Sequence, residues 1–244
     1  MKNMKTLIPG IHQFSQLPGI HEFFQHTTIQ NRKFSIIKSH LLLTERHPFF
    51  SQTTGFVYVI RNPIKVMFSN FNYLLLTSKV YSQNIDIERI NNFRTIYFSN
   101  FIENCGDKRW LKFGMGSWKD NVESWLNNHY KIPGIVVRYE DLSMDTFFQI
   151  TRICKFLNID PGQNRIEQAI LASSFSKMRE MEEREIERKS QEFFYKPSYQ
   201  AAHNAGIRFM NRGAISADCI EFKTEKIRFA ESDLAPLMRK FDYL

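Results

Sequence analysis

The sequence predicts an α/β fold, with helices flanking a mostly parallel sheet in three layers. Three short apolar runs, rich in β-branched and aromatic residues, indicate buried strands. Segments of helical periodicity lie between them, which is typical of parallel sheets. No stretch rich in Gly, Ser or Pro divides the 244 residues, so we expect a single domain over residues 1–244.

The predicted strands are short and well bounded. Residues 34–38 and 135–139 give two of them, and residues 56–60 give the strongest, bounded by Gly55 and Pro63. Ahead of them, residues 8–14 are repeated with variation at 17–23, and each copy contains Pro-Gly. Two copies are too few for a repeat protein, so we expect short helices or turns there.

Helices are expected between and after the strands. Pro63 suits a first helical turn, because the N–H that proline lacks would have no helical partner there. Ser143 or Asp145 is the expected N-cap of a later helix. A run dense in Glu and Arg at 178–190 predicts a solvated helix face or a mobile segment rather than a site. The expected helical ranges are 63–82, 87–104, 116–128, 145–157, 163–172, 174–190 and 221–242, the last with a break near Pro236.

Composition limits the class of protein and of partner. Hydrophobic residues make up 43% and charged residues 24%, which excludes a disordered or collagen-like chain. The net charge of +8 favours anionic partners: nucleotides, phosphate or sulfate groups, nucleic acid or acidic lipid. Because the basic residues are spread out and match no nucleic-acid motif, nucleic acid is not expected. The 23 Phe predict an aromatic core.

Cysteine use and hydropathy predict a reduced, cytoplasmic protein. Cys105, Cys154 and Cys219 are far apart, odd in number and without metal-ligand spacing, so neither a disulfide framework nor a metal site is expected. No apolar run approaches the roughly 20 residues of a membrane span, and no signal peptide is indicated.

Lys38-Ser39-His40 lies at the end of the first predicted strand. In α/β sheets, ligands bind beyond the carboxyl ends of strands. A histidine can accept a proton near neutral pH, and a nearby ammonium can stabilise negative charge on a group in transfer. The alternative is a hydrogen-bonded structural histidine beside a surface lysine.

Arg61-Asn62-Pro63 joins the second predicted strand to its helix. The Arg61 guanidinium could bind a phosphate bidentately at the sheet edge, and Ser69 could add a hydroxyl donor from the helix. The alternative is that Arg61 pairs with a carboxylate and Ser69 is ordinary helix surface.

Three further segments could carry chemistry. At the end of the third strand, Tyr139 could hydrogen-bond a nucleotide while Glu140 or Asp141 fixes the following turn. The alternative is a plain strand end with acidic residues at a helix N-terminus. Trp118, Val122 and Trp125 share one helix face, which is more often core than a cofactor site. The loop at 208–213 could bind a phosphate through a guanidinium and backbone N–H groups, or be a basic surface loop.

In order and spacing, these motifs resemble the cytosolic-type sulfotransferases that use 3′-phosphoadenosine 5′-phosphosulfate (PAPS). The resemblance covers about residues 34–243, and Asn121 stands where the family has His. The matching segments are Ile37-Lys38-Ser39-His40-Leu41, Tyr58 through Tyr73, Gly116-Ser117-Trp118 with Val122 and Trp125, Tyr139-Glu140-Asp141-Leu142, Ser173-Ser174-Phe175 with Met178, and Arg212-Gly213.

The resemblance implies a P-loop-like sulfotransferase fold, a PAPS site whose product is adenosine 3′,5′-bisphosphate, and no metal. It implies His40 as the general base and Lys38 as the cation beside the sulfonate. A hydroxyl or amine of a small molecule, glycan or lipid is the implied acceptor. The implied nucleotide contacts are Arg61 and Ser69 on the 3′-phosphate, Asn211, Arg212 and Gly213 closing over it, Tyr139 and Ser173 on the nucleoside, and Phe175 on the adenine.

One motif of the family has no counterpart in this sequence: the Pro-Lys-Ser-Gly-Thr-Thr-Trp loop that cradles the 5′-phosphosulfate. Two interpretations stay open. The chain is an N-terminally shortened form of a longer enzyme, or it is a degenerate homologue that binds a nucleotide or a partner without catalysis. The acceptor and the oligomeric state are not predicted.

Overall fold

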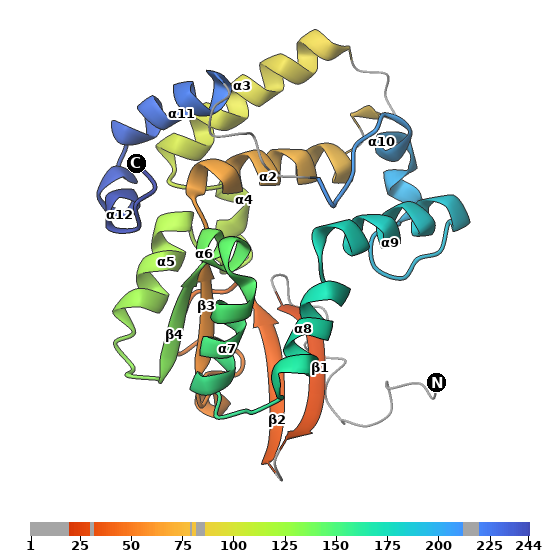
Figure 1. Ribbon diagram of the computed structural model, residues 1–244. Helices are drawn as coiled ribbons and strands as arrows, with labels where there is room; N and C mark the ends of the chain where they lie inside the picture. The colour runs from red at the N-terminus through yellow and green to blue at the C-terminus, as the bar shows by residue number, and fades with distance from the viewer. Residues whose placement is uncertain (1–19, 30–31, 79, 82–85, 212–219) are drawn as a thin grey trace. The chain divides into compact units, whose positions relative to one another are not determined.

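The computed structural model describes residues 20–29, 32–78, 80–81, 86–211 and 220–244 (Figure 1). The chain forms two compact units. One comprises Met1–Tyr58 and Asp107–Ile135, and the other Val59–Gly106 and Val136–Leu244. Strands and helices are both present, which confirms the α/β class. The expectation of one domain stays a prediction.

A hairpin opens the described part of the first unit. Strand β1 (Ile20–Ile29) pairs antiparallel with β2 (Arg32–Ser39), from Ile29 opposite Arg32 to Ile20 opposite Ser39. The helix or turn expected at 17–23 is therefore wrong from Ile20 onward. The β-branched and aromatic residues of 20–29 favour extended backbone, and they outweigh the Pro-Gly signal ahead of them. The first copy of the repeat, 8–14, lies outside the described residues.

The second sheet confirms the two other predicted strands. Strand β3 (Phe56–Ile60) pairs with β4 (Gly134–Arg138) in a small parallel sheet. Strand β4 ends one residue before the predicted boundary, because Tyr139 already begins helix α6 (Tyr139–Met144). The hairpin β1–β2 thus adds an antiparallel pair that the sequence pattern did not predict.

Helix α5 (Trp118–Asn127) is the main helix of the first unit, beside the short elements η2 (Phe50–Gln52) and α4 (Lys108–Leu111). Its apolar side contributes Trp118 and Val122 to the core, together with Leu43 and Phe49. The predicted Trp face is thus a core face, as its spacing indicated.

The second unit is mainly helical, and helix α2 packs against α3 and α11 (Figure 1). The expected caps and breaks are confirmed: Asp145 accepts the Phe148 N–H at 3.0 Å, and Pro236 lies in the first turn of α12. The helices are α2 (Pro63–Thr77), α3 (Ile87–Glu103), α7 (Thr146–Phe156), α8 (Gln163–Ala172), α9 (Phe175–Arg188), η4 (Pro197–Tyr199), α10 (Gln200–Asn204), α11 (Ile220–Ala230) and α12 (Ala235–Lys240).

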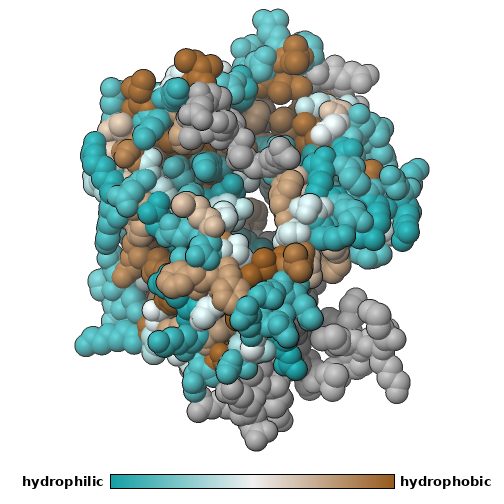
Figure 2. All heavy atoms as spheres, in the orientation of Figure 1, coloured by the Kyte–Doolittle hydropathy of each residue, from teal (hydrophilic) through white to brown (hydrophobic). Residues whose placement is uncertain are grey.

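An aromatic core forms where α2 meets α3, as the Phe content predicted. The ring of Phe71 lies 5.6–5.7 Å from the rings of Phe93, Tyr97 and Phe98, within the range of favourable aromatic pairs. On the face shown in Figure 2, hydrophobic and hydrophilic residues are interspersed. None of the described helices combines the length and the apolar composition that crossing a membrane requires.

Candidate functional site

Helix α5 fixes the backbone that follows Lys38-Ser39-His40. The Asn121 Nδ2 donates to the His40 carbonyl at 3.0 Å, and the Trp125 Nε1 donates to the Leu41 carbonyl at 3.0 Å. Two residues further on, the Leu43 N–H donates to the Ser124 hydroxyl at 3.1 Å. Three polar side chains of one helix therefore fix the backbone from His40 to Leu43.

Local sequence explains why α5 begins where it does. Ser117 caps the helix and forms a capping box with Asp120. Gly116 precedes the cap with φ of +68°, and a Cβ there would lie 2.7 Å from Leu42 Cδ2. Glycine adopts this backbone conformation without steric cost and leaves room for the Leu42 side chain. The Gly-Ser-Trp motif thus brings α5 against the segment after β2.

Asn121 also joins this helix to strand β3. Its Oδ1 accepts the Tyr58 hydroxyl at 3.0 Å, while its Nδ2 reaches the Met115 carbonyl at 2.8 Å as well as His40. Burial raises the pKa of Tyr58, so the phenol stays protonated and donates. The Tyr58 ring stacks on Trp125 at 5.8 Å, and the Phe56 ring meets Trp125 edge-on at 4.9 Å.

Lys38 and His40 themselves are exposed, and Ser39 between them is half-buried. Lys38 lies in β2, and His40 directly follows the strand, as predicted. Successive residues of a strand point to opposite faces, so Lys38 and Ser39 face opposite sides. The first unit therefore presents the Lys38 ammonium to solvent beside a residue whose backbone is held by α5.

In the second unit, the structure brings Arg61 and Tyr139 together. Arg61 follows β3 and Tyr139 follows β4, and the Arg61 Cζ lies 4.4 Å from the centre of the Tyr139 ring. This distance is within the range of a cation–π interaction. Two motifs almost 80 residues apart in sequence thus meet where the two parallel strands end.

Glu140 fixes the turn that carries Arg61. Its Oε1 accepts the Asn62 N–H at 3.2 Å, and the Asn62 side chain in turn caps α2 by accepting the Ile64 N–H at 2.9 Å. The expectation that Glu140 or Asp141 fixes the turn after β4 stays a prediction. The Glu140 carboxylate bonds to the turn after β3.

The described part of the predicted phosphate loop, residues 208–211, is fixed by α2 and α9. Asn211 donates to the Asn72 side chain at 2.9 Å, and Asn72 donates to the Arg208 carbonyl at 2.8 Å. Arg179 donates to the Met210 carbonyl at 2.7 Å. Arg212 and Gly213, the other predicted members of this loop, lie outside the described residues.

Two glutamates of α9 are buried, contrary to the predicted solvated face. Glu182 has no exposed surface and accepts the N–H groups of Phe209 and Met210 at 2.6 and 2.8 Å. Glu185 is 4% exposed, and one of its oxygens accepts the N–H groups of Phe194 and Tyr195 at 2.7 and 3.1 Å. Two loops supply backbone donors, and these compensate the burial of the charges.

Glu183 on the same helix is an ion-pair partner. Arg208 donates from its Nε to both Glu183 oxygens at 3.0 and 3.1 Å. Burial opposes the ionised form, but the hydrogen bonds and charges of Arg208 and Arg179 outweigh it and lower the pKa of Glu183. The carboxylate is therefore charged at neutral pH and fixes Arg208 at the start of the predicted phosphate loop.

The remaining predicted residues lie on helices of the second unit. Ser69 is half-buried on α2, the helix that Asn62 caps. Ser173 ends α8, is exposed, and donates its hydroxyl to the Ala169 carbonyl at 2.7 Å. Phe175 begins α9 and is 42% exposed. Ser173 and Phe175 thus stand at the start of the helix that also fixes residues 209–210.

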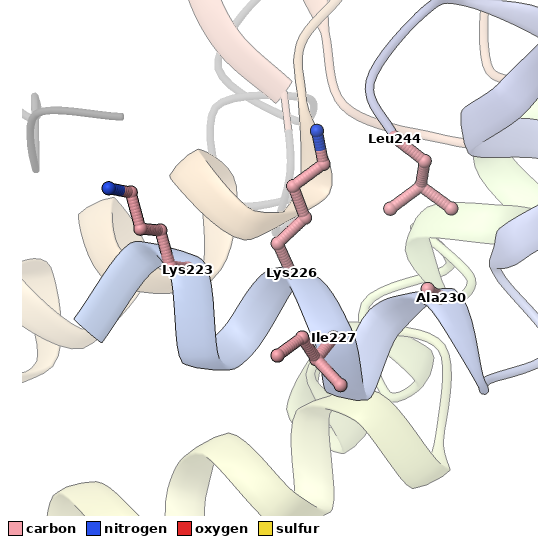
Figure 3. A pocket seen from close by; sticks show the side chains of 5 residues that line it. All are labelled: Lys223, Lys226, Ile227, Ala230 and Leu244. Carbon is pink, nitrogen blue, oxygen red and sulfur yellow. The ribbon is translucent and has the colours of Figure 1, made fainter. Parts of the chain in front are cut away.

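An open surface hollow of about 400 Å³ lies in the second unit, beside α11. Figure 3 shows Lys223 and Lys226 extending from this helix, with Leu244 nearby. None of its lining residues belongs to a predicted motif, so we do not assign the site to it. Among the described residues, no cluster of His, Cys, Asp or Glu could hold a metal ion.

Sequence reasoning missed three residues whose side chains hold the described segments in place. They are His47, which contacts Ser39, and the buried glutamates Glu182 and Glu185. No motif marks His47. The two glutamates are three residues apart and so share a helix face, but the surrounding charges hid that pattern. Their backbone partners come from loops that only the folded chain brings near.

Comparison with known proteins gives the family. A family model described as a sulfotransferase domain matches residues 2–242. Sulfotransferase 2A6 from Mus musculus is 30% identical over 132 residues, which cover 54% of this chain and 41% of that protein. Sulfotransferase 2B1 from the same species is 29% identical over 147 residues, which cover 59% and 38%. The chain thus spans less than half the length of these relatives.

A solved structure agrees in fold. The crystal structure of mouse sulfotransferase SULT7A1 complexed with PAP matches with a TM-score of 0.53 at 18% identity, covering 87% of this chain and 71% of that one. At this identity the likeness supports the fold alone. With motifs, fold and a family model over nearly the whole chain in agreement, this chain belongs to the sulfotransferase domain family.

Proposed function

We propose that this chain transfers a sulfonate group from PAPS to a hydroxyl or amine acceptor. The acceptor oxygen or nitrogen forms a bond to the sulfonate sulfur as the bond from sulfur to the 5′-phosphate oxygen breaks, in line. The acceptor proton passes to His40, and adenosine 3′,5′-bisphosphate leaves with the negative charge. Such a transfer depends mainly on positioning and charge stabilisation.

His40 and Lys38 supply the chemistry in this proposal. A neutral imidazole removes the acceptor proton, and the Lys38 ammonium stabilises the sulfonate and the leaving phosphate oxygen. Their exposure supports the proposal, because both must reach a ligand. The three α5 hydrogen bonds to the following backbone support it further, since a general base needs a fixed position.

The observation that carries the nucleotide half of the proposal is the Arg61–Tyr139 contact. The Tyr139 ring supports one face of the Arg61 guanidinium. A guanidinium carries its N–H donors around the edge of its plane, and this planar edge matches a phosphate bidentately. We assign the 3′-phosphate to Arg61, with Ser69 as a second donor. Tyr139 would contact the nucleoside.

The rest of the nucleotide site is assigned to two segments that α9 joins. Ser173 and Phe175 at its start would contact the nucleoside and the adenine. Asn211, with Arg212 and Gly213, would close over the 3′-phosphate. The bonds from Glu182 to residues 209–210 support this assignment, since they fix the chain directly ahead of Asn211.

Calorimetry with adenosine 3′,5′-bisphosphate tests the nucleotide half. We expect binding to the native chain, weaker binding of adenosine 5′-monophosphate, and a roughly 10- to 100-fold loss for Arg61→Ala, as for a lost charged hydrogen-bond partner. Arg165→Ala, which removes an exposed arginine of α8, is the matched control. Equal affinity for both nucleotides would overturn the assignment of Arg61 to a 3′-phosphate.

Transfer of labelled sulfonate from PAPS to a panel of phenols, alcohols and amines tests the chemistry. We expect His40→Ala to lose on the order of 10²–10⁴ in kcat, and exposed His129→Ala to keep full activity. Nucleotide binding without any transfer would favour the alternative, a sulfotransferase-like protein that binds a nucleotide or a partner without catalysis.

A further inference from the structure

A second histidine, His47, contacts the Lys38-Ser39-His40 segment. The Nε2 of His47 is 3.0 Å from the Ser39 hydroxyl oxygen, and the Leu41 N–H donates to the same oxygen at 3.1 Å. His47 is not part of any motif that the sequence singled out. Its contact is with the one residue between the two proposed catalytic side chains.

The backbone determines the tautomer of His47. The Phe49 N–H donates to His47 Nδ1 at 3.3 Å, so Nδ1 presents a lone pair. In the neutral ring the proton is then on Nε2, which donates to the Ser39 oxygen. The two lone pairs of that oxygen are filled by the His47 Nε2–H and the Leu41 N–H, which fixes the orientation of the Ser39 side chain.

The surroundings of His47 favour this neutral, fixed ring. The Trp125 ring meets it edge-on at 6.3 Å, and the Phe49 ring meets it at 6.4 Å. Burial lowers the pKa of His47. The Trp125 Nε1 also donates to the Leu41 carbonyl, so one ring contacts both His47 and the segment that His47 supports.

We propose that His47 is a positioning residue, whose Nε2–H bond to Ser39 fixes the turn that presents Lys38 and His40. Ser39 and Lys38 point to opposite faces of β2. A hydrogen bond that holds Ser39 on one face therefore also holds the backbone from which Lys38 extends on the other face. The consequence for catalysis rests on the proposed function, whereas the consequence for the turn does not.

Amide exchange tests the effect on the turn without any assay of activity. His47→Phe keeps the ring and removes both nitrogens, and we expect the Leu41 amide to exchange roughly 5- to 10-fold faster, as for the loss of one hydrogen bond. The Leu43 amide, bonded to Ser124, should keep its protection in the same sample. Ser39→Ala should affect the Leu41 amide in the same way. Unchanged protection of Leu41 in both variants overturns the proposal.

Nitrogen chemical shifts of the histidine rings test the contact directly. In the native chain at neutral pH, we expect the proton of His47 on Nε2 and a bare Nδ1. Ser39→Ala should move the His47 Nε2 signal and leave exposed His129 unchanged. A proton on Nδ1 would contradict the geometry on which the proposal depends.

Steady-state kinetics can distinguish a positioning role of His47 in catalysis from a purely structural role. His47→Phe should lower kcat roughly 5- to 20-fold and leave the KM for PAPS within about 2-fold, while His47→Gln, which keeps a donor at the same reach, should recover most of the loss. The double variant of Ser39→Ala and His47→Phe should be no worse than either single one. If the native chain transfers no sulfonate, the proposed function fails, and the exchange and shift experiments still decide the role of His47.

Discussion

The guanidinium of Arg61 lies over the ring of Tyr139, 4.4 Å from its centre, and the two residues follow neighbouring parallel strands. In the proposed nucleotide site, Tyr139 would have two separable roles. Its ring would orient Arg61, and its hydroxyl would contact the nucleoside. Substitutions that remove one role at a time can distinguish them.

We expect Tyr139→Leu to weaken binding of adenosine 3′,5′-bisphosphate roughly 3- to 30-fold, because the face that supports Arg61 is lost. Tyr139→Phe keeps the face and should lose affinity only by the contribution of one hydrogen bond to the nucleoside, roughly 2- to 10-fold. Calorimetry measures both. If Tyr139→Leu binds as tightly as Tyr139→Phe, the stacking has no part in binding.

The buried carboxylate of Glu182 gives a prediction about stability. In Glu182→Gln, an amide N–H faces one of the two backbone donors, at Phe209 or Met210. Because that donor would lose its partner, we expect the free energy of unfolding to fall by about 1–3 kcal/mol. Exposed Glu180→Gln on the same helix should change it by less than about 0.5 kcal/mol. Urea unfolding measures the difference, and equal effects would show that the burial of Glu182 is unimportant.

Asn121 is expected to couple strand β3 to the segment after β2. Asn121→Ala removes the partner of the Tyr58 hydroxyl and a donor to the His40 carbonyl, so we expect a loss of about 1–3 kcal/mol in stability. Tyr58→Phe removes only the hydrogen bond between the Tyr58 hydroxyl and Asn121. If Asn121 acts through Tyr58, the double variant should lose less free energy of unfolding than the sum of the losses of Asn121→Ala and Tyr58→Phe, as measured by urea unfolding.

The lowered pKa of His47 predicts a change in the free energy of unfolding with pH. The unfolded chain takes up a proton on this histidine near pH 6.5, while the folded chain does so only at lower pH, because burial lowers the pKa. The stability that His47 contributes is therefore complete above pH 6.5 and is lost as the pH falls through its folded pKa. We expect His47→Phe to flatten this part of the curve, in unfolding measured between about pH 5 and about pH 8. A slope identical to that of the native chain would contradict the prediction.

The sequence predicted the elements whose signals are local. Strand β3, helix α2 with Pro63 at its start, and the Asp145 cap each depend on a few consecutive residues, and each is confirmed. Strand β1 was missed because its pairing with β2 decides it, and a repeated Pro-Gly pointed to turns. The distinction is between local propensity and long-range pairing.

The same distinction applies to the candidate site. Arg61 and Tyr139 were predicted as site residues because each lies at the end of a strand, and strand ends are where α/β proteins bind ligands. Their contact with each other could not be predicted, because it depends on the pairing of β3 with β4. Glu182 was not found, because a glutamate among charged residues is buried only when a distant loop supplies backbone donors. His47 carries no motif, and its partner Ser39 becomes a partner only through the turn between them.

Gly116 offers a test of the backbone that brings α5 to the proposed catalytic segment. Gly116→Ala combines an unfavourable φ of +68° with a Cβ only 2.7 Å from Leu42 Cδ2, whereas Gly206→Ala has a similar φ of +82° with no atom within 4 Å. Both should lose about 1 kcal/mol through backbone strain. We expect Gly116→Ala to lose about 1–3 kcal/mol more, as overpacked sites do. Because the strain is shared, thermal unfolding of the two variants isolates the steric contact. Equal losses would mean that Leu42 moves aside without cost and that α5 does not require glycine at this position.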